Sequence, residues 1–196
     1  MGKQKKLIFT SYGLTSSLGR QLIGEELAKD KDLNSKKIFI FHEPYYSIER
    51  MLIGACISLG FEENNIIISG RQKSDKDLLN MDYIYVGEGN TFEILFLLRE
   101  RGFDKLIAEA FESGCTYIGA SAGAIISGVN VKEALVMDRN FVRMSDFQGL
   151  GLFNGIIMPH YTEKELEEYI MDKPDLKIRY ETILSVANDQ ILVLEE

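Results

Sequence analysis

Short apolar runs alternate with segments of helical periodicity along most of the chain. Five of these runs predict strands: Lys6–Ser11, Lys37–His42, Asn65–Gly70, Tyr83–Gly89 and Thr116–Ala120. Such runs, bounded by Gly, Asn or charged residues, are typical of parallel strands covered on both faces. Two stripes at helical spacing lie between them: Ile48, Met51, Leu52, Ala55 and Leu59, then Leu106, Ile107, Ala110 and Phe111. A glycine follows each stripe and predicts the end of a helix.

This alternation predicts an α/β fold, a three-layer sandwich around a mostly parallel, doubly wound sheet with right-handed crossovers. The closing segment "ILSVANDQILVLEE" predicts a C-terminal β-hairpin that turns at Asn188-Asp189, so the sheet is expected to be mixed at one end. Repeats and Pro/Gly-rich linkers are absent from the 196 residues. We therefore expect one domain over residues 1–196.

The charge balance narrows the classes of partner. A net charge of −8 disfavours nucleic acid and anionic membranes, which bind basic patches. The sequence shows no cleavable signal and no apolar run long enough to span a bilayer. Two cysteines, Cys56 and Cys115, form neither a disulfide framework nor a zinc cluster. Together these features predict a cytoplasmic protein without nucleic-acid or membrane partners.

One serine stands among very small residues in the stretch "TYIGASAGAII". Gly119 to Gly123 match the G-x-S-x-G pattern of a nucleophile elbow around Ser121. A sharp turn from strand to helix strains the central residue and leaves room only for Gly or Ala beside it. The turn raises the serine Oγ above the carboxyl end of the sheet, where open α/β sheets bind ligands. The alternative is a tight turn in which Ser121 only caps the next helix.

A serine nucleophile needs a general base, and the chain has only two histidines, His42 and His160. His160 follows an apolar strand-like run that ends in Pro159, and a helix with the capping box Thr162-x-x-Glu165 comes next. Its place at a strand end favours His160 as the base. The pattern at His42 is compatible with an ordinary surface imidazole.

The third member of a triad is a carboxylate that orients the imidazole. In the α/β-hydrolase chain order it falls between serine and histidine, which leaves Glu133, Asp138 and Asp146. We favour Asp138 because "ALVMD" predicts a strand with this residue at its end, and Glu133 is the second choice. The loop Gly87–Gly89 precedes a helix that starts near Thr91 and can present a backbone N–H to an oxyanion.

Three motifs together resemble peptidase family S51, the group of dipeptidase E and cyanophycinase. "VGEGNTFEIL" is similar to the family's Gly-Gly-Asn-Thr-Phe loop, "GASAGAI" to its nucleophile turn and "MPHYTE" to its Pro-His segment. The resemblance covers the chain from about Phe9 to its end. It implies a fold like that of class I glutamine amidotransferases, although a true amidotransferase carries cysteine at the elbow.

Carried over to this chain, the resemblance implies that Ser121 is the nucleophile, His160 the base and Asp138 the acid. Gly89 and Ala122 would supply the oxyanion N–H groups. The implied reaction is hydrolysis of small peptides through an acyl-enzyme, with neither metal nor cofactor. The alternatives are another serine-dependent amide or ester hydrolase, or a non-catalytic module that binds small molecules.

Two departures from the family bear on the substrate. Glu88 replaces a glycine of the family loop, and its carboxylate near the mouth of the site is expected to disfavour an acidic substrate. Dipeptidase E also has an Arg-bearing segment after the catalytic histidine that recognises an N-terminal Asp. Here the next arginine is Arg179, so the sequence gives no support for Asp-X specificity.

Overall fold

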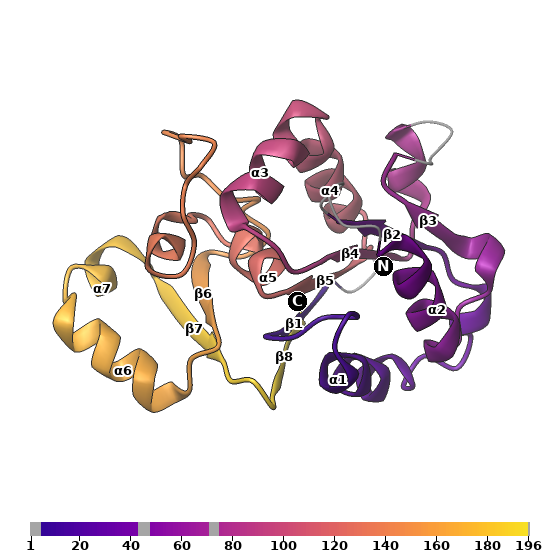
Figure 1. The fold of residues 1–196 in the computed structure, drawn as a ribbon, viewed down its shortest axis with the longest axis horizontal. Helices are drawn as coiled ribbons and strands as arrows, with labels where there is room; N and C mark the ends of the chain where they lie inside the picture. The colour runs from indigo at the N-terminus through magenta and orange to yellow at the C-terminus, as the bar shows by residue number, and fades with distance from the viewer. Residues whose placement is uncertain (1–4, 43–47, 71–74, 196) are drawn as a thin grey trace.

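The computed structural model describes residues 5–42, 48–70 and 75–195, and a twisted sheet occupies their centre (Figure 1). Six strands in this part of the chain form it, in the order β3-β2-β4-β5-β1-β8. Their bounds are β1 Lys6–Thr10, β2 Ile38–Phe41, β3 Ile66–Ile68, β4 Tyr83–Val86, β5 Thr116–Ala120 and β8 Ile191–Glu195. The first five run parallel, and β8 runs antiparallel to β1.

Helices cover both faces of this sheet (Figure 1). One face carries α1 (Ser17–Leu27) and α2 (Glu49–Leu59), and the other carries α3 (Thr91–Glu100), α4 (Phe103–Glu112) and α5 (Ala122–Ser127). Short 3₁₀ segments are η1 Leu33–Ser35, η2 Glu63–Asn65, η3 Asp75–Asn80 and η4 Lys132–Val136. The predicted three-layer α/β architecture is confirmed.

Strand β2 shows why the strand signals are continuous apolar runs. Ile38 and Ile40 pack on the side of α1 and α2, whereas Phe39 and Phe41 pack on the side of α3 and α4. All four side chains are buried. Because both faces of a covered parallel sheet are core, the alternation of apolar and polar residues disappears.

Three predicted helix boundaries are confirmed, and local hydrogen bonds or backbone conformation explain each of them. Gly60 ends α2 in the left-handed conformation, with φ of 113°. Asn90 caps α3, since its side chain accepts from the N–H groups of Phe92 and Glu93. The capping box of Thr162 and Glu165 opens α6 (Glu163–Asp172).

The C-terminal strands correct one expectation. The chain does turn at Asn188-Asp189, but β7 (Thr182–Val186) and β8 do not pair as a hairpin. Strand β7 instead pairs in parallel with β6 (Gly155–Pro159), and α6 and α7 (Leu176–Arg179) lie between the two in sequence. The β6–β7 pair lies beside the main sheet, while β8 covers the edge of β1 (Figure 1). A local pattern predicts strands and a turn, but it does not specify their partners.

The segment "ALVMD" is a second correction, because it forms the 3₁₀ turn η4 and not a strand. Asp138 continues this turn, since its N–H donates to Ala134 O at 2.7 Å. Leu135, Val136 and Met137 remain 37–47% exposed. A short apolar run fits a strand and a helical turn equally well by periodicity. The expectation that Asp138 ends a strand is therefore wrong.

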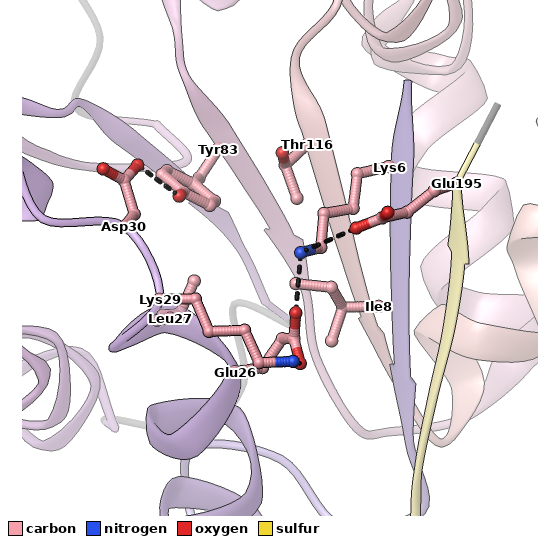
Figure 2. A pocket seen from close by; sticks show the side chains of 9 residues that line it. All are labelled: Lys6, Ile8, Glu26, Leu27, Lys29, Asp30, Tyr83, Thr116 and Glu195. Carbon is pink, nitrogen blue, oxygen red and sulfur yellow. Dashed lines mark hydrogen bonds and ion pairs between the residues drawn. The ribbon is translucent and has the colours of Figure 1, made fainter. Parts of the chain in front are cut away.

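At the amino end of the sheet, an ion-pair network joins β8, β1 and α1. Lys6 Nζ lies 2.6 Å from Glu26 Oε1 and 3.1 Å from Glu195 Oε1, beside a cavity of about 260 Å³ (Figure 2). The Glu26 side chain is only 6% exposed and also pairs with Lys29. Burial alone raises the pKa of Glu26, but hydrogen bonds from Lys29 and Lys6 outweigh burial and lower it. Ionised Glu26 therefore stabilises the fold.

We expect Glu26→Gln to lower the free energy of unfolding by about 1.5–3 kcal/mol at pH 7, because Lys6 and Lys29 lose their charged partner and an amide NH2 replaces one of the two accepting oxygens. The difference from wild type should be full above the ordinary Glu pKa of 4.5 and should vanish as the pH falls through the lowered folded-state value. Urea unfolding at several pH values measures it. The control is Glu112→Gln, which breaks the Lys5 pair at a side chain that is 67% exposed and should cost less than about 1 kcal/mol. Equal losses in the two variants would contradict the assignment.

Candidate functional site

The turn from β5 into α5 holds Ser121 in a strained backbone conformation, with φ of 49° and ψ of −109°. Such a conformation costs about 1–3 kcal/mol in a non-glycine residue. The neighbours are small for steric reasons. A Cβ at Gly119 would lie 2.8 Å from Ala124 N, and one at Gly123 would lie 2.0 Å from Val86 O. The small residues around Ser121 are thus required by the tight packing of α5 on the strands.

The side chain of Ser121 does not cap the helix that it precedes. Ser121 occupies the N-cap position of α5, yet its hydroxyl makes no capping hydrogen bond. Its Oγ lies instead 3.1 Å from His160 Nε2. This distance is within reach of proton transfer between a nucleophile and its base.

The end of β6 places His160 in this contact. His160 also has a positive φ, 67°, and its N–H lies 2.9 Å from Val186 O and 2.8 Å from Ser11 Oγ. Ser11 in turn donates its hydroxyl to Val186 O at 2.6 Å. The ring of Tyr12 meets the imidazole edge-on, with 5.4 Å between centroids. These contacts from three strand ends fix the imidazole opposite Ser121.

A residue absent from the candidates drawn from the sequence orients the imidazole. His160 Nδ1 lies 2.7 Å from Asn188 Oδ1. Because β6 and β7 run in register with Pro159 opposite Val186, the residues just beyond these two meet in space. With Oδ1 as acceptor, Nδ1 carries the proton and Nε2 presents its lone pair to Ser121. The parallel pairing of β6 and β7 was the missing signal, since the motif order restricted the search to residues before His160.

The structure does not bring Asp138 to His160. Asp138 Oδ2 accepts from the N–H of Thr91 at 2.9 Å and from its hydroxyl at 2.6 Å. Its carboxylate therefore sits at the N-terminus of α3, where the helix dipole favours negative charge. Among the described residues, His160 Nδ1 has Asn188 and no carboxylate as its hydrogen-bond partner. The predicted Ser121-His160-Asp138 arrangement is corrected in its third member.

The other two candidates for the triad acid, Glu133 and Asp146, form ion pairs with arginines. Glu133 accepts from Tyr169 Oη at 2.7 Å and pairs with Arg179 at 3.1 Å, which joins η4 to α6 and α7. Burial, and then the hydrogen bond to Glu133, raises the pKa of Tyr169 well above its ordinary value, so the phenol stays a donor. Asp146 pairs with Arg99 on α3 at 3.3 Å. Arg179, the first arginine after His160, is thus committed to structural ion pairs.

The loop after β4 lies against the serine turn. Gly87 O accepts from the N–H of Gly123 at 3.2 Å, and Gly89 has φ of 148°. No described residue accepts a hydrogen bond from the N–H of Gly89 or of Ala122. Ala122 is the first residue of α5, so its N–H also benefits from the positive end of the helix. Among the described residues, these two N–H groups therefore have no acceptor, and their role at an oxyanion stays a prediction.

The side chain of Glu88 links the loop after β4 to the loop after β1 by hydrogen bonds. Its Oε1 accepts from Gly13 N at 2.7 Å and from Thr15 Oγ1 at 2.8 Å. Its Oε2 lies 3.4 Å from Tyr85 Oη. Burial, and then the charge of Glu88, raises the pKa of Tyr85 well above its ordinary value, which keeps the phenol neutral. Glu88 itself has no left-handed φ, so the loop conformation accepts a non-glycine residue here.

The described residues form neither a metal-binding cluster nor a membrane-spanning helix. No group of three His, Cys, Asp or Glu side chains that could hold a metal ion is found there. Across the same residues, none of the helices has the length and apolar character needed to cross a membrane.

The model of peptidase family S51 matches residues 43–196, and the chain belongs to this family. An uncharacterized peptidase of Listeria monocytogenes is 36% identical over 115 residues, which are 57% of this chain and 56% of that protein. Peptidase E of Shewanella amazonensis is 35% identical over 107 residues, 53% of this chain and 45% of that protein. The chain thus matches about half the length of these curated relatives.

Solved structures share the fold over nearly the whole chain. A crystal structure of a candidate peptidase E from Listeria monocytogenes covers 98% of each chain, with a TM-score of 0.71 and 24% identity. A crystal structure of a peptidase from an acI-B1 Actinobacterium covers 99% of this chain and 85% of that one, with a TM-score of 0.64 and 19% identity. At these identities the likeness establishes the architecture alone.

The orientation of His160 gives a test that separates Asn188 from Asp138. A fluorophosphonate probe reports the reactivity of an activated serine hydroxyl. We expect Asn188→Ala to slow labelling of Ser121 by about 10- to 100-fold, because a displaced imidazole is a poor base. Asp138→Asn keeps an acceptor for Thr91 and should leave the labelling rate within about twofold.

Asp189→Ala is the matched control, since Asp189 is the exposed neighbour of Asn188 and makes no hydrogen bond to His160. Thermal unfolding of each variant checks the fold. A larger loss of labelling in Asp138→Asn than in Asn188→Ala would restore Asp138 as the residue that orients His160.

Proposed function

We propose that this protein is a serine peptidase that hydrolyses amide bonds of small peptides through an acyl-enzyme. The observation that carries the proposal is the 3.1 Å contact between Ser121 Oγ and His160 Nε2, at a strained turn on the carboxyl edge of the sheet. Membership of peptidase family S51 and the relatives named peptidase E support the choice of an amide substrate.

The first half of the reaction forms the acyl-enzyme. Ser121 Oγ attacks the carbonyl carbon while His160 Nε2 takes the hydroxyl proton. Asn188 holds the tautomer that leaves Nε2 free, as asparagine does in cysteine peptidases of the Cys-His-Asn type. The N–H groups of Gly89 and Ala122 stabilise the oxyanion. His160 then gives its proton to the departing amine, and the C–N bond breaks.

The second half repeats these steps with water. His160 Nε2 takes a proton from a water molecule, whose oxygen attacks the acyl carbonyl. The same two N–H groups hold the second oxyanion, and the proton returns to Ser121 Oγ as the carboxylic acid leaves. No step requires a metal or a cofactor. The buried cysteines Cys56 and Cys115 suit a reducing compartment, so the proposal includes a cytoplasmic location.

A fluorophosphonate should label Ser121 in the wild-type protein, as peptide mapping by mass spectrometry would show. Ser121→Ala should lose the label entirely, and His160→Ala should react far more slowly. Hydrolysis of a dipeptide library should fall by about 10⁴- to 10⁶-fold in both variants. Ser127→Ala is the control, since Ser127 is a buried serine of α5 whose hydroxyl donates to Ala124 O.

The outcomes separate the remaining possibilities. Labelling of Ser121 together with ester or non-peptide amide turnover, but without peptide cleavage, identifies another serine-dependent hydrolase. Absence of labelling in folded protein rejects the enzyme and leaves a small-molecule binding module.

A further inference from the structure

A cavity of about 310 Å³ opens at the carboxyl ends of β2 and β4, on the side of α2. Its wall is mostly apolar: Ile48, Met51 and Leu52 line it together with the buried ring of Tyr85. Gly87, Glu88 and Gly89, which form the loop after β4, also line it, as do the polar residues Thr15 and His42. The cavity therefore shares its boundary with the proposed oxyanion loop.

The strand order gives the distance from this cavity to Ser121. Strand β4 lies between β2 and β5 in the sheet. Neighbouring strands are about 4.8 Å apart, so the ends of β2 and β5 are separated by roughly 10 Å. Gly87, Glu88 and Gly89, at the end of the intervening strand β4, also line the cavity, so it begins about one strand spacing from the end of β5. The cavity is thus within reach of a residue whose carbonyl is bound at Ser121.

The position of His160 assigns the cavity to one side of the scissile bond. His160 protonates the departing amine, so the leaving group lies near Nε2. The backbone of His160 is bound to Ser11 and Val186, next to β1, which pairs with β5 on the side away from β4. The cavity lies across Ser121 from this position, beyond β4. It therefore faces the acyl part of the substrate.

The lining defines the chemistry of the side chain that fits. Three apolar side chains of α2 and its N-terminus favour aliphatic or aromatic groups. Among the described residues that line the cavity, Glu88 is the one carboxylate; Gly13 and Thr15 hold it in place, and it repels an acidic side chain. We propose, resting on the proposed function, that this cavity binds the acyl-side residue and selects large apolar side chains over acidic ones.

The test compares kcat/KM for a series of dipeptides that differ only in the acyl-side residue. Burying a Leu, Met or Phe side chain contributes about 1.5–3 kcal/mol, so these substrates should exceed the Ala substrate by roughly 10-fold or more. The Asp substrate should be at or below the level of Ala. Labelling of wild-type Ser121 by a small fluorophosphonate is measured in parallel, since it reports catalysis without the cavity.

Two variants of helix α2 test whether the cavity causes the preference for large apolar side chains. Met51 and Ile57 of α2 are 44% and 45% exposed, but only Met51 lines the cavity. Met51→Glu should lower the Leu-to-Ala ratio of kcat/KM by about 10-fold, because a charged group replaces part of the apolar wall. Ile57→Glu should leave the ratio unchanged.

The possible outcomes distinguish failure of the cavity assignment from failure of the proposed function. Labelling and peptide cleavage with no preference for large apolar residues, or equal ratios in Met51→Glu and wild type, overturns the cavity assignment and leaves the proposed function standing. A preference for Asp on the acyl side also overturns it. Absence of labelling overturns the proposed function and the cavity assignment with it.

Discussion

The close approach of helix α5 to the end of strand β4 is the contact on which the candidate site depends. Gly123 lies so near Val86 that even a methyl group does not fit between them, and its N–H reaches Gly87 O at 3.2 Å. This approach places the start of α5 beside the loop after β4. The two N–H groups proposed for the oxyanion come together for that reason, and Ser121 accepts a strained backbone as the cost.

Features with a local cause were predictable from the sequence. The continuous apolar runs identify buried strands because both faces of β2 and its neighbours are covered. The small residues around Ser121 report the turn, since no larger side chain fits there. Gly60, Asn90 and Thr162 mark helix ends through hydrogen bonds within a few residues. The helix ends arise from interactions between chain neighbours, whereas the apolar runs and the small residues record burial and close packing at the residue itself.

Features that depend on long-range pairing were not predictable in the same way. The turn at Asn188 was found, but its partner was not, because β7 and β8 read as a hairpin and join different sheets. Asp138 and Asn188 lie on opposite sides of His160 in sequence, and only the register of β6 with β7 brings Asn188 to the imidazole. Chain order therefore favoured the wrong residue as the one that orients His160.

The hydroxyl of Ser11 links the six-stranded sheet to the smaller β6–β7 sheet. It follows β1 of the main sheet, donates to Val186 O at the end of β7 and accepts from His160 N at the end of β6. The nucleophile thus belongs to one sheet and its base to the other. Ile157 of β6 and Val186 of β7 belong to the same buried cluster as side chains of β1, β4 and α5, so the two sheets share one core. The distance between Ser121 and His160 consequently depends on how the smaller sheet packs against the main sheet.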